Sequence, residues 1–567
     1  MIELETRVKI PFLWGKAVFK KKNWSQINLI VGPNGSGKTL LAQGLAKQFE
    51  EAGFAVRFVK SDRGDRKNQL AILKSNDKIR QKIETVLSSM FGKSIKFIED
   101  IDGTLIPIVE NKAWNVEYML EDAECHGLRE IILLLISLYQ KSGDTNSGNE
   151  SGAGSGNLKN VATNSGAAGE CVFFDEPELH LHPQFQTFFM NEIRKEVQHS
   201  SRKIFFLISH SPFFIDLRTP EDLTGVICCH INKVPTSIEE LNEEDDQLFR
   251  RFLPRFNTYH KQFFFSDNQI FVEGYTDQQM FTYLLPFIEN EYSAAGTGII
   301  DVGGKDELGV FCKVCSLLGT NGRIITDLDS LFSGKLRDVF CEDERVISWL
   351  EKQREKQTAF YESIFTAKEL EQEITLEKLI RKLERMLVEI GKAAIELSPA
   401  EIKAELKKDS KHQQKNDQPT SKNSEFHFSQ KDAELLEILL QKLALLQEKH
   451  ENAEAVDTYK TVLLQGVNAV PEVLEKMLPA KLAATIPLVK NLSAFILAAA
   501  EAARVYVLHK GCIEHYYTQN TILFMPVSAK DRLFRNELDF IQTAHKKTVR
   551  KKYEDLIALL EKACSAV

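Results

Sequence analysis

Two groups of acidic residues lie far apart in the sequence, and each follows a short apolar run of the kind that forms a buried strand. The first group is the pair Asp175-Glu176, and the second combines Glu273 with Asp327 and Asp329. Carboxylates bind divalent cations, and one acidic group is expected in any protein that uses ATP with magnesium. The second group therefore indicates a second metal-dependent reaction on the same chain.

A phosphate-binding loop precedes the first acidic pair. The apolar run at 27–31 predicts a strand, the segment 40–49 predicts a helix, and GPNGSGKT lies between them. Glycines in such a loop permit a tight turn whose N–H groups face the phosphates, while the lysine reaches the β and γ oxygens. The sequence therefore predicts a site for ATP and magnesium, formed by Gly32, Asn34, Gly35, Ser36, Gly37, Lys38, Thr39 and Asp175.

Four side chains of this site are expected to act on the metal or on the attacking water. Thr39 and Asp175 are predicted to bind magnesium, and Glu176 is predicted to polarise the water. His210 follows a further apolar run at 204–208, where it would sense the γ-phosphate. The alternative for a single histidine is a hydrogen-bonded core residue. Its order after the carboxylate strand favours the functional role.

The segments DEPELHLHP at 175–183 and SHSP at 209–212 resemble the ABC-type ATPases related to the RecF and SMC proteins. The resemblance implies that ATP binds between two ATPase heads, and therefore a homo-oligomer, a dimer or larger. Each head would supply a signature loop to the other, and the candidate is ECHGLR at 124–129. Cys125 stands where the usual signature has a serine, so the sequence departs from the pattern at this contact.

The second acidic group also follows predicted strands. The apolar run before Glu273 would place this carboxylate at the rim of a sheet, where open α/β sheets have their sites. A later run at 323–326 leads into Asp327 and Asp329. Because side chains i and i+2 of an extended strand share one face, these aspartates are expected to hold one cation together. The alternative is a pair of ordinary solvated loop acids.

The order of strand, glutamate, helix, strand, helix, strand and Asp-x-Asp, introduced by VEGYTD, is similar to that of Toprim domains. An ATPase head followed by a Toprim domain resembles the OLD (overcoming lysogenization defect) family of ATP-dependent nucleases. The resemblance implies a DNA endonuclease that uses two divalent ions, magnesium or also manganese. One ion would bind Glu273, Asp327 and Asp329. The second would lie near Asp277 and Glu514.

A last strand-like run, VYVLHKGCIE at 505–514, carries Lys510 and Glu514. In the OLD family a lysine after such a strand assists phosphodiester cleavage, and Lys510 fits that role. A lysine near the scissile phosphate would stabilise the additional negative charge of the transition state. The alternative for Lys510 is a solvated lysine at a strand end.

A chain of 567 residues is long enough for about two to four domains. The predicted fold class is α/β, with an ABC-type P-loop ATPase domain followed by a Toprim domain that a leucine-rich helical insertion interrupts. The predicted boundaries are 1–262 for the ATPase domain, 263–337 and 504–567 for the Toprim domain with C-terminal helices, and 338–503 for the insertion. The polar stretches 141–169 and about 407–432 are expected to be a flexible insertion and a disordered loop.

Composition restricts the function only weakly. A net charge of −8 neither indicates nor excludes nucleic-acid binding. No segment reaches the roughly 18 uninterrupted apolar residues of a membrane-spanning helix, and the start lacks the apolar core of a signal peptide. Nine irregularly spaced cysteines fit reduced thiols better than a disulfide framework. We therefore expect a cytoplasmic protein with no membrane partner.

The leading interpretation is an ATP-regulated DNA endonuclease. The resemblance also implies bacterial antiphage defence, in some members with a second component such as a helicase or a reverse transcriptase. Two alternatives stay open: a RecF-like or SMC-like ATPase clamp that holds nucleic acid without cutting it, and a topoisomerase-like enzyme. Tyr275 is expected to pack rather than act as a nucleophile. The basic run at 545–552 is either a phosphate-backbone contact or an exposed helix face.

Overall fold

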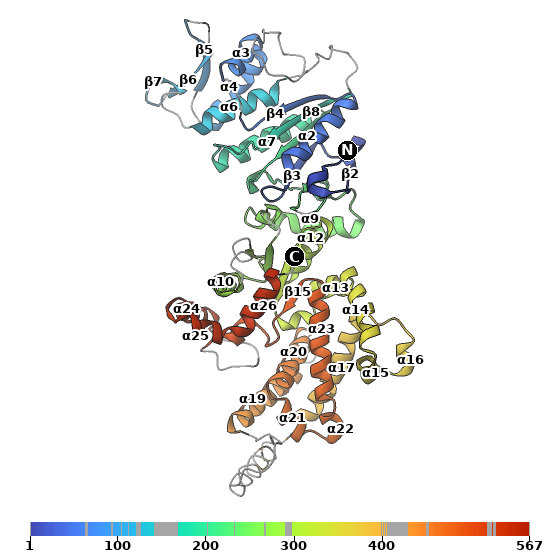
Figure 1. Cartoon of the computed structure of the whole chain (residues 1–567). Helices are drawn as coiled ribbons and strands as arrows, with labels where there is room; N and C mark the ends of the chain where they lie inside the picture. The colour runs from blue at the N-terminus through green and yellow to red at the C-terminus, as the bar shows by residue number, and fades with distance from the viewer. Residues whose placement is uncertain are drawn as a thin grey trace. The chain divides into compact units, whose positions relative to one another are not determined.

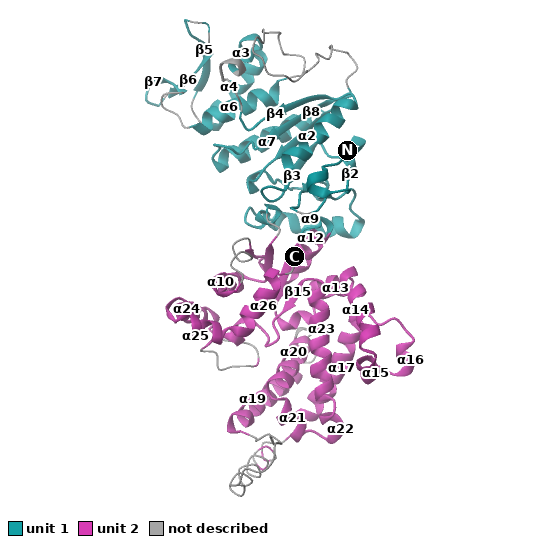
Figure 2. Cartoon of the chain, viewed as in Figure 1, with its two compact units in different colours: residues 1–267, 317–320 teal, residues 268–316, 321–567 magenta. Residues whose placement is uncertain are grey.

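The fold is described from a computed structural model of the chain (Figure 1). The chain forms two compact units (Figure 2). Unit 1 comprises Met1–Asp267 with Leu317–Thr320, and unit 2 comprises Asn268–Ser316 with Asn321–Val567. The structure describes residues 2–62, 66–91, 94–101, 103, 105–111, 113–120, 126–140, 168–200, 202–231, 233–265, 268–289, 297–397, 400, 402, 404, 429–448, 453–518, 524 and 529–565.

Unit 1 is built on a six-stranded sheet with the strand order β11-β10-β3-β9-β8-β4. The strands from β10 to β4 run parallel, and β11 pairs with β10 in the antiparallel direction. Strand β9 lies between β3 and β8, so the carboxyl ends of these three strands meet at one edge of the sheet. The bounds are β3 Ile27–Val31, β4 Ala55–Val59, β8 Glu170–Asp175, β9 Lys203–Ile208, β10 Val226–Cys228 and β11 Thr236–Ser237.

The predicted strands around the phosphate-binding loop are present, and the predicted helix lies within α2 (Lys38–Glu51). Parallel strands that are covered on both faces read as continuous apolar runs, and every residue of β9 is buried. Helix α2 packs on the sheet through Phe49, whose ring lies 5.3 Å from that of Trp24 and 5.4 Å from that of Phe206. This aromatic core supports the strand ends that carry the first candidate site.

Smaller elements complete unit 1. Strands β1 (Ile2–Val8) and β2 (Phe19–Trp24) form an antiparallel pair. The polar stretch predicted at 141–169 lies outside the described residues up to 167. The other elements used below are β5 Ser94–Glu99, β6 Leu105–Asn111 and β7 Val116–Met119, which form an antiparallel sheet, and the helices α3 Arg66–Ser75, α4 Asp77–Phe91, α6 His126–Tyr139 and α7 Pro183–His199.

Unit 2 contains a four-stranded parallel sheet in the order β13-β12-β14-β15. Its strands are β12 Gln269–Val272, β13 Gly298–Asp301, β14 Arg323–Thr326 and β15 Val505–Val507. Helices α10 (Tyr275–Leu284) and α12 (Lys305–Leu317) follow β12 and β13. Strand β15 pairs with β14 although the helical insertion separates them in the sequence. The predicted α/β fold, interrupted by helices, is confirmed.

The insertion between β14 and β15 is helical. On α17 the leucines at three- and four-residue steps, including Leu379, Leu383 and Leu387, are fully buried. Of the loop predicted at 407–432, the part up to 428 lies outside the described residues, while 430–432 begin a helix. The bounds are α13 Lys335–Cys341, α14 Glu344–Lys356, α15 Thr358–Ile364, α16 Ala367–Leu370, α17 Leu376–Ile395, α19 Gln430–Gln447, α20 Ala453–Ala469, α21 Pro471–Met477, α22 Ala480–Ala483 and α23 Ile486–Ala502.

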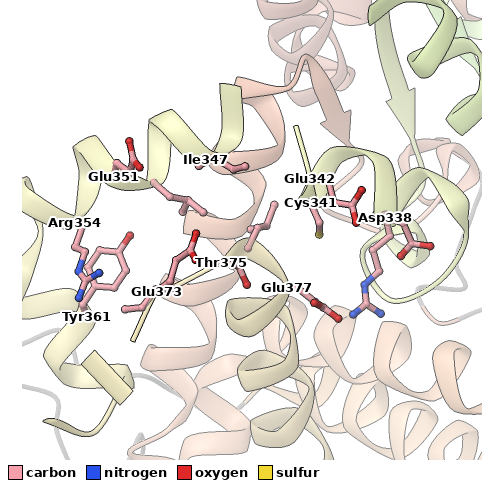
Figure 3. A pocket seen from close by; sticks show the side chains of 14 residues that line it. Asp338, Cys341, Glu342, Ile347, Glu351, Arg354, Tyr361, Glu373, Thr375 and Glu377 are labelled. Carbon is pink, nitrogen blue, oxygen red and sulfur yellow. The ribbon is translucent and has the colours of Figure 1, made fainter. Parts of the chain in front are cut away.

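A cavity of about 470 Å³ lies among α13, α14, α15 and α17 (Figure 3). Acidic side chains such as Glu351 and Glu377 line it together with apolar ones such as Leu350 and Leu376. Arg337, also in the lining, donates a 2.9 Å hydrogen bond to the carbonyl oxygen of Phe332, in the segment that follows β14. This hydrogen bond thus connects the cavity lining to the segment that follows β14 of the four-stranded sheet.

One described segment, Ala480–Ala502, is long and apolar enough to cross a membrane by length and composition alone. It spans α22 and α23 and has a mean hydropathy of 1.6. Helix α23 packs against β15, α14 and α17, and Ile486, Val489 and Leu492 are fully buried there. Its apolar side is therefore used in the core of unit 2.

The C-terminal part of unit 2 follows the 3-10 helix η6 (Ile513–Tyr516) and contains α24 (Lys530–Thr543), α25 (Lys546–Lys552) and α26 (Glu554–Ser565). Buried residues of α26, Leu556 and Leu560, share a hydrophobic core with Ile270 and Val272 of β12. The C-terminal helices are therefore an integral part of the unit that carries the second acidic group.

Candidate ATP and metal sites

The phosphate-binding loop leaves β3 at Gly32, whose backbone φ is +140°. A Cβ atom at this position would lie 2.2 Å from the carbonyl oxygen of Cys229, so only glycine fits beneath the neighbouring strand end. Gly37, with φ +84°, precedes the first residue of α2. The N-terminus of α2 therefore opens onto the loop, which is an arrangement that stabilises bound anions.

Lys38 and Ser36 hold polar groups in this loop. Lys38 Nζ donates hydrogen bonds to the carbonyl oxygens of Gly32 at 3.0 Å and Pro33 at 2.8 Å, and burial lowers the pKa of its ammonium group. Ser36 Oγ is buried and has no hydrogen-bond partner among the described residues. Asn34 and Gly35 lie exposed at the tip of the loop. A phosphate would give Ser36 a partner and Lys38 a charged acceptor, so these residues fit a nucleotide.

The predicted magnesium ligands and water-handling residues meet at the same sheet edge. Thr39 Oγ1 donates to Asp175 Oδ1 at 3.2 Å, and burial raises the pKa of Asp175 against the effect of this hydrogen bond. His210 Nε2 lies 3.7 Å from Glu176 Oε1. Burial, and then the charge of Lys38, lowers the pKa of His210, so its ring is neutral at pH 7. A neutral histidine beside a carboxylate is suited to orient a water molecule.

Glu178 is a residue of this site that the sequence analysis missed. Its Oε1 accepts a 2.5 Å hydrogen bond from the backbone N–H of His210, and its Oε2 accepts one of 3.0 Å from Ser209 Oγ. Burial raises the pKa of the Glu178 carboxyl, while these hydrogen bonds oppose the shift. Glu178 therefore holds the segment that carries His210 against the segment that carries Glu176. The signal in the sequence was a third acid, two residues after Glu176.

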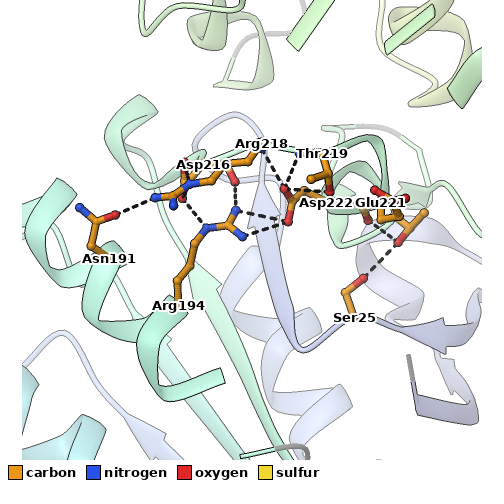
Figure 4. A network of polar contacts seen from close by, with 9 residues as sticks. Ser25, Asn191, Arg194, Asp216, Arg218, Thr219, Glu221 and Asp222 are labelled. Atoms are coloured by element: carbon orange, nitrogen blue, oxygen red, sulfur yellow. Dashed lines mark hydrogen bonds and ion pairs between the residues drawn. The ribbon is translucent and has the colours of Figure 1, made fainter. Parts of the chain in front are cut away.

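A network of charged side chains fixes the segment after His210 (Figure 4). Arg194 of α7 forms ion pairs with Asp216 and, at 3.2 Å, with Asp222. Arg218 pairs with Asp216 at 2.9 Å and donates to Asn191 Oδ1 at 2.7 Å. Helix α7 begins shortly after Glu176 and Glu178, so this network ties both flanks of the candidate site to one helix.

The candidate signature loop is only partly described. Residues 124 and 125, the second of which is Cys125, lie outside the described residues. Gly127 lies in the first turn of α6, where an added Cβ would come within 3.0 Å of the carbonyl oxygen of His180. A glycine thus favours the close approach of α6 to the segment after β8.

Five carboxylates gather where the strands of the second sheet end. The residues come from β12, β14 and β15, which are consecutive neighbours in the sheet, and from the helices that follow them. The sheet therefore brings together acids that the whole helical insertion separates in the sequence. They are Glu273 after β12, Asp277 in the first turn of α10, Asp327 after β14, Asp329 in the 3-10 helix η5 (Leu328–Leu331), and Glu514 in η6.

Three of these carboxyl groups, those of Glu273, Asp277 and Asp327, have a raised pKa. Burial, followed by the charges of Glu273 and Glu514, raises the pKa of Asp277 to about 7. The pKa of Asp327 is raised well above its usual range by loss of solvent and by Asp277 and Glu273. Burial and Asp329 raise the pKa of Glu273 as well. Like charges that crowd in this way favour a bound cation, because the cation offsets their repulsion.

Two lysines contact this group, and the sequence analysis assigned a role to neither. Lys305 Nζ lies 3.0 Å from Asp329 Oδ2, and Lys530 Nζ lies 2.8 Å from Glu514 Oε1. Burial alone would raise the pKa of Glu514, but hydrogen bonds from Cys512 and Lys530 lower it. Lys530 also acts on Glu273, whose raised pKa it lowers. The two lysines therefore partly neutralise the carboxylates.

Lys510, the lysine predicted to assist cleavage, has a different partner. Its Nζ forms a 2.5 Å ion pair with Asp555 Oδ2 of α26 and lies 4.9 Å from the ring centre of Tyr516. The loop that carries Lys510 is held by the insertion, because Gln465 of α20 donates to the carbonyl oxygen of Lys510 at 2.7 Å. The structure thus brings Glu514 to the acidic group and pairs Lys510 with an acid outside it.

The geometry expected for Asp327 and Asp329 was wrong in one respect. The extended strand ends at Thr326, and the chain turns into η5 directly after Asp327. A hydrogen bond between the hydroxyls of Thr326 and Ser330, 2.7 Å apart, stabilises this turn. The two carboxylates therefore do not share one strand face. Asp329 still raises the pKa of Glu273, and both Glu273 and Asp329 raise the pKa of Asp327. The two aspartates therefore belong to one acidic group.

The donor set suits a hard cation, although it is not a preformed metal site. Among the described residues, no three carboxylate, histidine or cysteine side chains lie close enough to hold an ion as they stand. Asp329 Oδ1 is buried and has no hydrogen-bond partner among those residues, which fits an oxygen awaiting a cation. All five acids supply oxygen ligands, as magnesium and manganese prefer. For a cation to bind, the ion pairs of Lys305 with Asp329 and of Lys530 with Glu514 would have to break.

Tyr275 was expected to pack, and that prediction was wrong. Its side chain is 61% exposed at the start of α10, two residues after Glu273. Its ring lies edge-on to that of Phe534 of α24, with ring centres 6.3 Å apart. The side chain is therefore available to a ligand that approaches the carboxylates.

Two family models match the chain. Residues 60–215 match the AAA ATPase domain, and residues 264–329 match the Toprim domain of proteins like the overcoming lysogenization defect protein. No curated protein matches the chain with significant similarity. The second match includes four of the five carboxylates and ends before Glu514. The chain is therefore an ATPase domain followed by an OLD-like Toprim domain, as predicted, and this pairing supports an ATP-dependent function of the nuclease type.

Proposed function

We propose that this chain is an ATP-regulated, divalent-metal-dependent DNA endonuclease. The observation that carries the proposal is the convergence of Glu273, Asp277, Asp327, Asp329 and Glu514 at neighbouring strand ends of the Toprim domain. Buried acids that repel one another reduce stability, and proteins retain such groups mainly where a ligand or a reaction uses them. A bound cation resolves the repulsion in this site.

In this proposal Glu273, Asp327 and Asp329 hold one cation, and Asp277 with Glu514 holds another. Divalent cations bound there supply a polarised water molecule and offset the negative charge that develops on the phosphate. Lys530 lies beside Glu514 and would exchange that carboxylate for a phosphate oxygen when DNA enters. Lys305 would do the same from the side of Asp329.

The ATP site would act as the regulator. Lys38 and the N–H groups of the loop would bind the triphosphate, and Thr39 with Asp175 would hold magnesium. Glu176 would polarise the water, and His210 would orient it while Glu178 fixes the His210 backbone. The resemblance to RecF and SMC proteins supports a homo-oligomer that closes around ATP. A role in antiphage defence, alongside a second component such as a helicase or a reverse transcriptase, rests on the resemblance to the OLD family, and the expected cytoplasmic location rests on composition.

One observation favours a second function. The described carboxylates do not form a ready-made metal site, and lysines neutralise two of them. A Toprim domain in which lysines replace the cations would hold nucleic acid without cutting it. This would make the chain an ATPase clamp.

The test is incubation of supercoiled and linear DNA with the intact protein and either magnesium or manganese, with and without ATP, compared with Glu273→Ala. Nicking or linearisation that depends on metal and on Glu273 is the expected result. Binding without cutting in every nucleotide state would favour the clamp, and relaxation without nicks would favour a topoisomerase. Cleavage that persists in Glu273→Ala would contradict the site assignment.

A further inference from the structure

Helix α25 carries an unusual concentration of positive charge. Its sequence is KKTVRKK, so five of its seven residues are basic. Lys546, Lys547, Lys551 and Lys552 are exposed, and none of them forms an ion pair in the described part of the chain. Many other exposed lysines of this protein do have an acidic partner, for example Lys562 with Glu501 at 2.9 Å. The charges of these four lysines are therefore available to an external partner.

The residues that precede α25 add to its positive charge. Residues 530–553 contain eight lysines and arginines and three acidic residues, in a chain whose net charge is −8. One of the three acids, Glu537, is fully buried, and exposed Arg532 and Arg535 add to the lysines of α25. The acids Glu554 and Asp555 follow at the start of α26, where Asp555 is already paired with Lys510.

The helix is firmly mounted on α24. Tyr553, directly after α25, is buried and donates a hydrogen bond to Glu537, which also accepts a 2.5 Å hydrogen bond from the backbone N–H of Thr518. Val549 is fully buried, and Arg550 Nε donates to the carbonyl oxygen of Phe287 at 3.0 Å. Because these contacts occupy Val549, Tyr553 and Arg550, the four lysines project outward from a rigid support.

Helix α24 links this support to the Toprim carboxylates. It begins at Lys530, which is paired with Glu514. Glu537 lies two turns further along, or roughly 10 Å at 1.5 Å per residue. A length of roughly 10 Å corresponds to about three base pairs of duplex DNA at two phosphates per 3.4 Å, so α24 is long enough to separate α25 from the carboxylates by a few base pairs.

The side chains around α25 suit a duplex backbone better than a single strand. Proteins that bind single strands without sequence preference present aromatic rings on which bases stack. No aromatic side chain of α24, α25 or α26 is among the exposed large hydrophobic side chains of the described residues, and the exposed ring of Tyr275 belongs to the start of α10, where it contacts Phe534. Phosphate contacts from lysine need no stacking platform and carry no sequence information.

We infer that α25, supported by α24, is a surface that binds the phosphate backbone of double-stranded DNA beside the Toprim carboxylates. The inference rests on the proposed function in that the bound duplex is the substrate of those carboxylates. The surface positions the duplex several base pairs from the point of cleavage, with Lys530 at the near end and the α25 lysines at the far end.

The test replaces Lys546, Lys547, Lys551 and Lys552 together by glutamine, which keeps helix propensity and removes four charges. All variants carry Glu273→Ala, so that binding of a fluorescein-labelled 30-base-pair duplex is measured by anisotropy with magnesium and without cleavage. We expect affinity to fall at least about tenfold, and the slope of log affinity against log salt to lose about 3–4 units, because each phosphate contact contributes close to one unit.

The matched control is the quadruple glutamine variant of Lys352, Lys356, Lys481 and Lys490, which are exposed lysines of the helical insertion that form no ion pair with another described residue. It should bind duplex DNA like the parent. A quadruple arginine variant of the α25 lysines should also bind normally, which separates loss of charge from loss of fold. ATP hydrolysis of the insertion control should equal that of the protein that carries Glu273→Ala alone.

An unchanged salt slope in the α25 glutamine variant, or an equal loss in the control, would overturn the inference. A single-stranded 30-mer that binds more tightly than the duplex and loses as much affinity would overturn the assignment to duplex DNA. Failure of the proposed function has a different signature: the parent chain without Glu273→Ala would bind the duplex through α25 and never cut it.

Discussion

Lys530 Nζ lies 2.8 Å from Glu514 Oε1, so a cation from the start of α24 faces the Toprim carboxylates. Lys510, which follows β15, is paired with Asp555 instead. Glu514 completes the acidic group, and Lys530 faces it. No local sequence pattern fixes the length of chain between these two residues. In the proposed reaction Lys530 is the residue positioned to contact the phosphate.

Lys530→Ala should impair DNA cleavage far more than Lys510→Ala. Loss of one charged donor that stabilises a transition state costs about 10²–10³ in rate, and we expect a fall of that size for Lys530→Ala. Lys510→Ala should change the rate by less than about threefold, because removing a half-exposed ion pair costs little. Single-turnover cleavage of a labelled duplex at saturating magnesium measures both. The opposite ranking would show that Lys510 is the residue that assists cleavage.

Asp327→Asn should stabilise the metal-free protein while abolishing cleavage. The substitution removes a charge that burial and the neighbouring carboxylates disfavour, so the free energy of unfolding should rise. Melting in EDTA should then move to a higher temperature. Magnesium should stabilise the parent protein and have less effect on the variant. A lower melting temperature for Asp327→Asn in EDTA would contradict the account of the acidic group.

Glu178→Ala should lower the turnover of ATP and leave its binding nearly unchanged. The hydrogen bonds of Glu178 within the described part of the chain go to Ser209 and the His210 backbone, so its loss should displace the histidine and reduce kcat by about tenfold, within the range of general-base effects. Glu178→Gln retains an oxygen acceptor and should recover part of the rate. ATP affinity and kcat are measured separately, by nucleotide titration and by phosphate release. A change confined to ATP affinity would mean that Glu178 supports the loop and not His210.

Glu176→Gln should bind ATP without hydrolysing it and accumulate as an oligomer. The amide no longer polarises the water, so hydrolysis should slow by at least about 10². If ATP joins two heads, the trapped complex should elute from size exclusion as a dimer or larger with ATP and at a smaller size without nucleotide. A single elution position in both conditions would contradict closure between heads. Lys38→Ala, which should not bind ATP, is the control.

The parts of the structure that could be predicted from sequence are those with short-range signals. The phosphate-binding loop, β8 and β9 are continuous in the chain, and their apolar runs, glycines and carboxylates specify strand, turn and site together. The leucine pattern of α17 likewise predicts a buried helix face. These features depend on neighbours only a few residues away.

The parts that could not be predicted depend on long-range pairing or on local turns. Lys530 meets Glu514 only because α24 packs against α10 and η6, and no spacing in the sequence predicts that contact. The sequence of the strand before Asp327 does not predict that η5 begins directly after Asp327. Tyr275 reads as an aromatic core residue but begins a helix at the sheet rim, where it stays exposed.

The most direct test of the account is the single-turnover cleavage rate of a duplex bound by the parent protein and by Glu273→Gln, at matched occupancy and saturating magnesium or manganese. Glu273→Gln preserves the size of the side chain and removes the charge that would hold the cation. The account predicts that this variant binds DNA and ATP as the parent does and cleaves at least about 10³-fold more slowly. A rate within about threefold of the parent would show that the Toprim carboxylates do not carry the reaction.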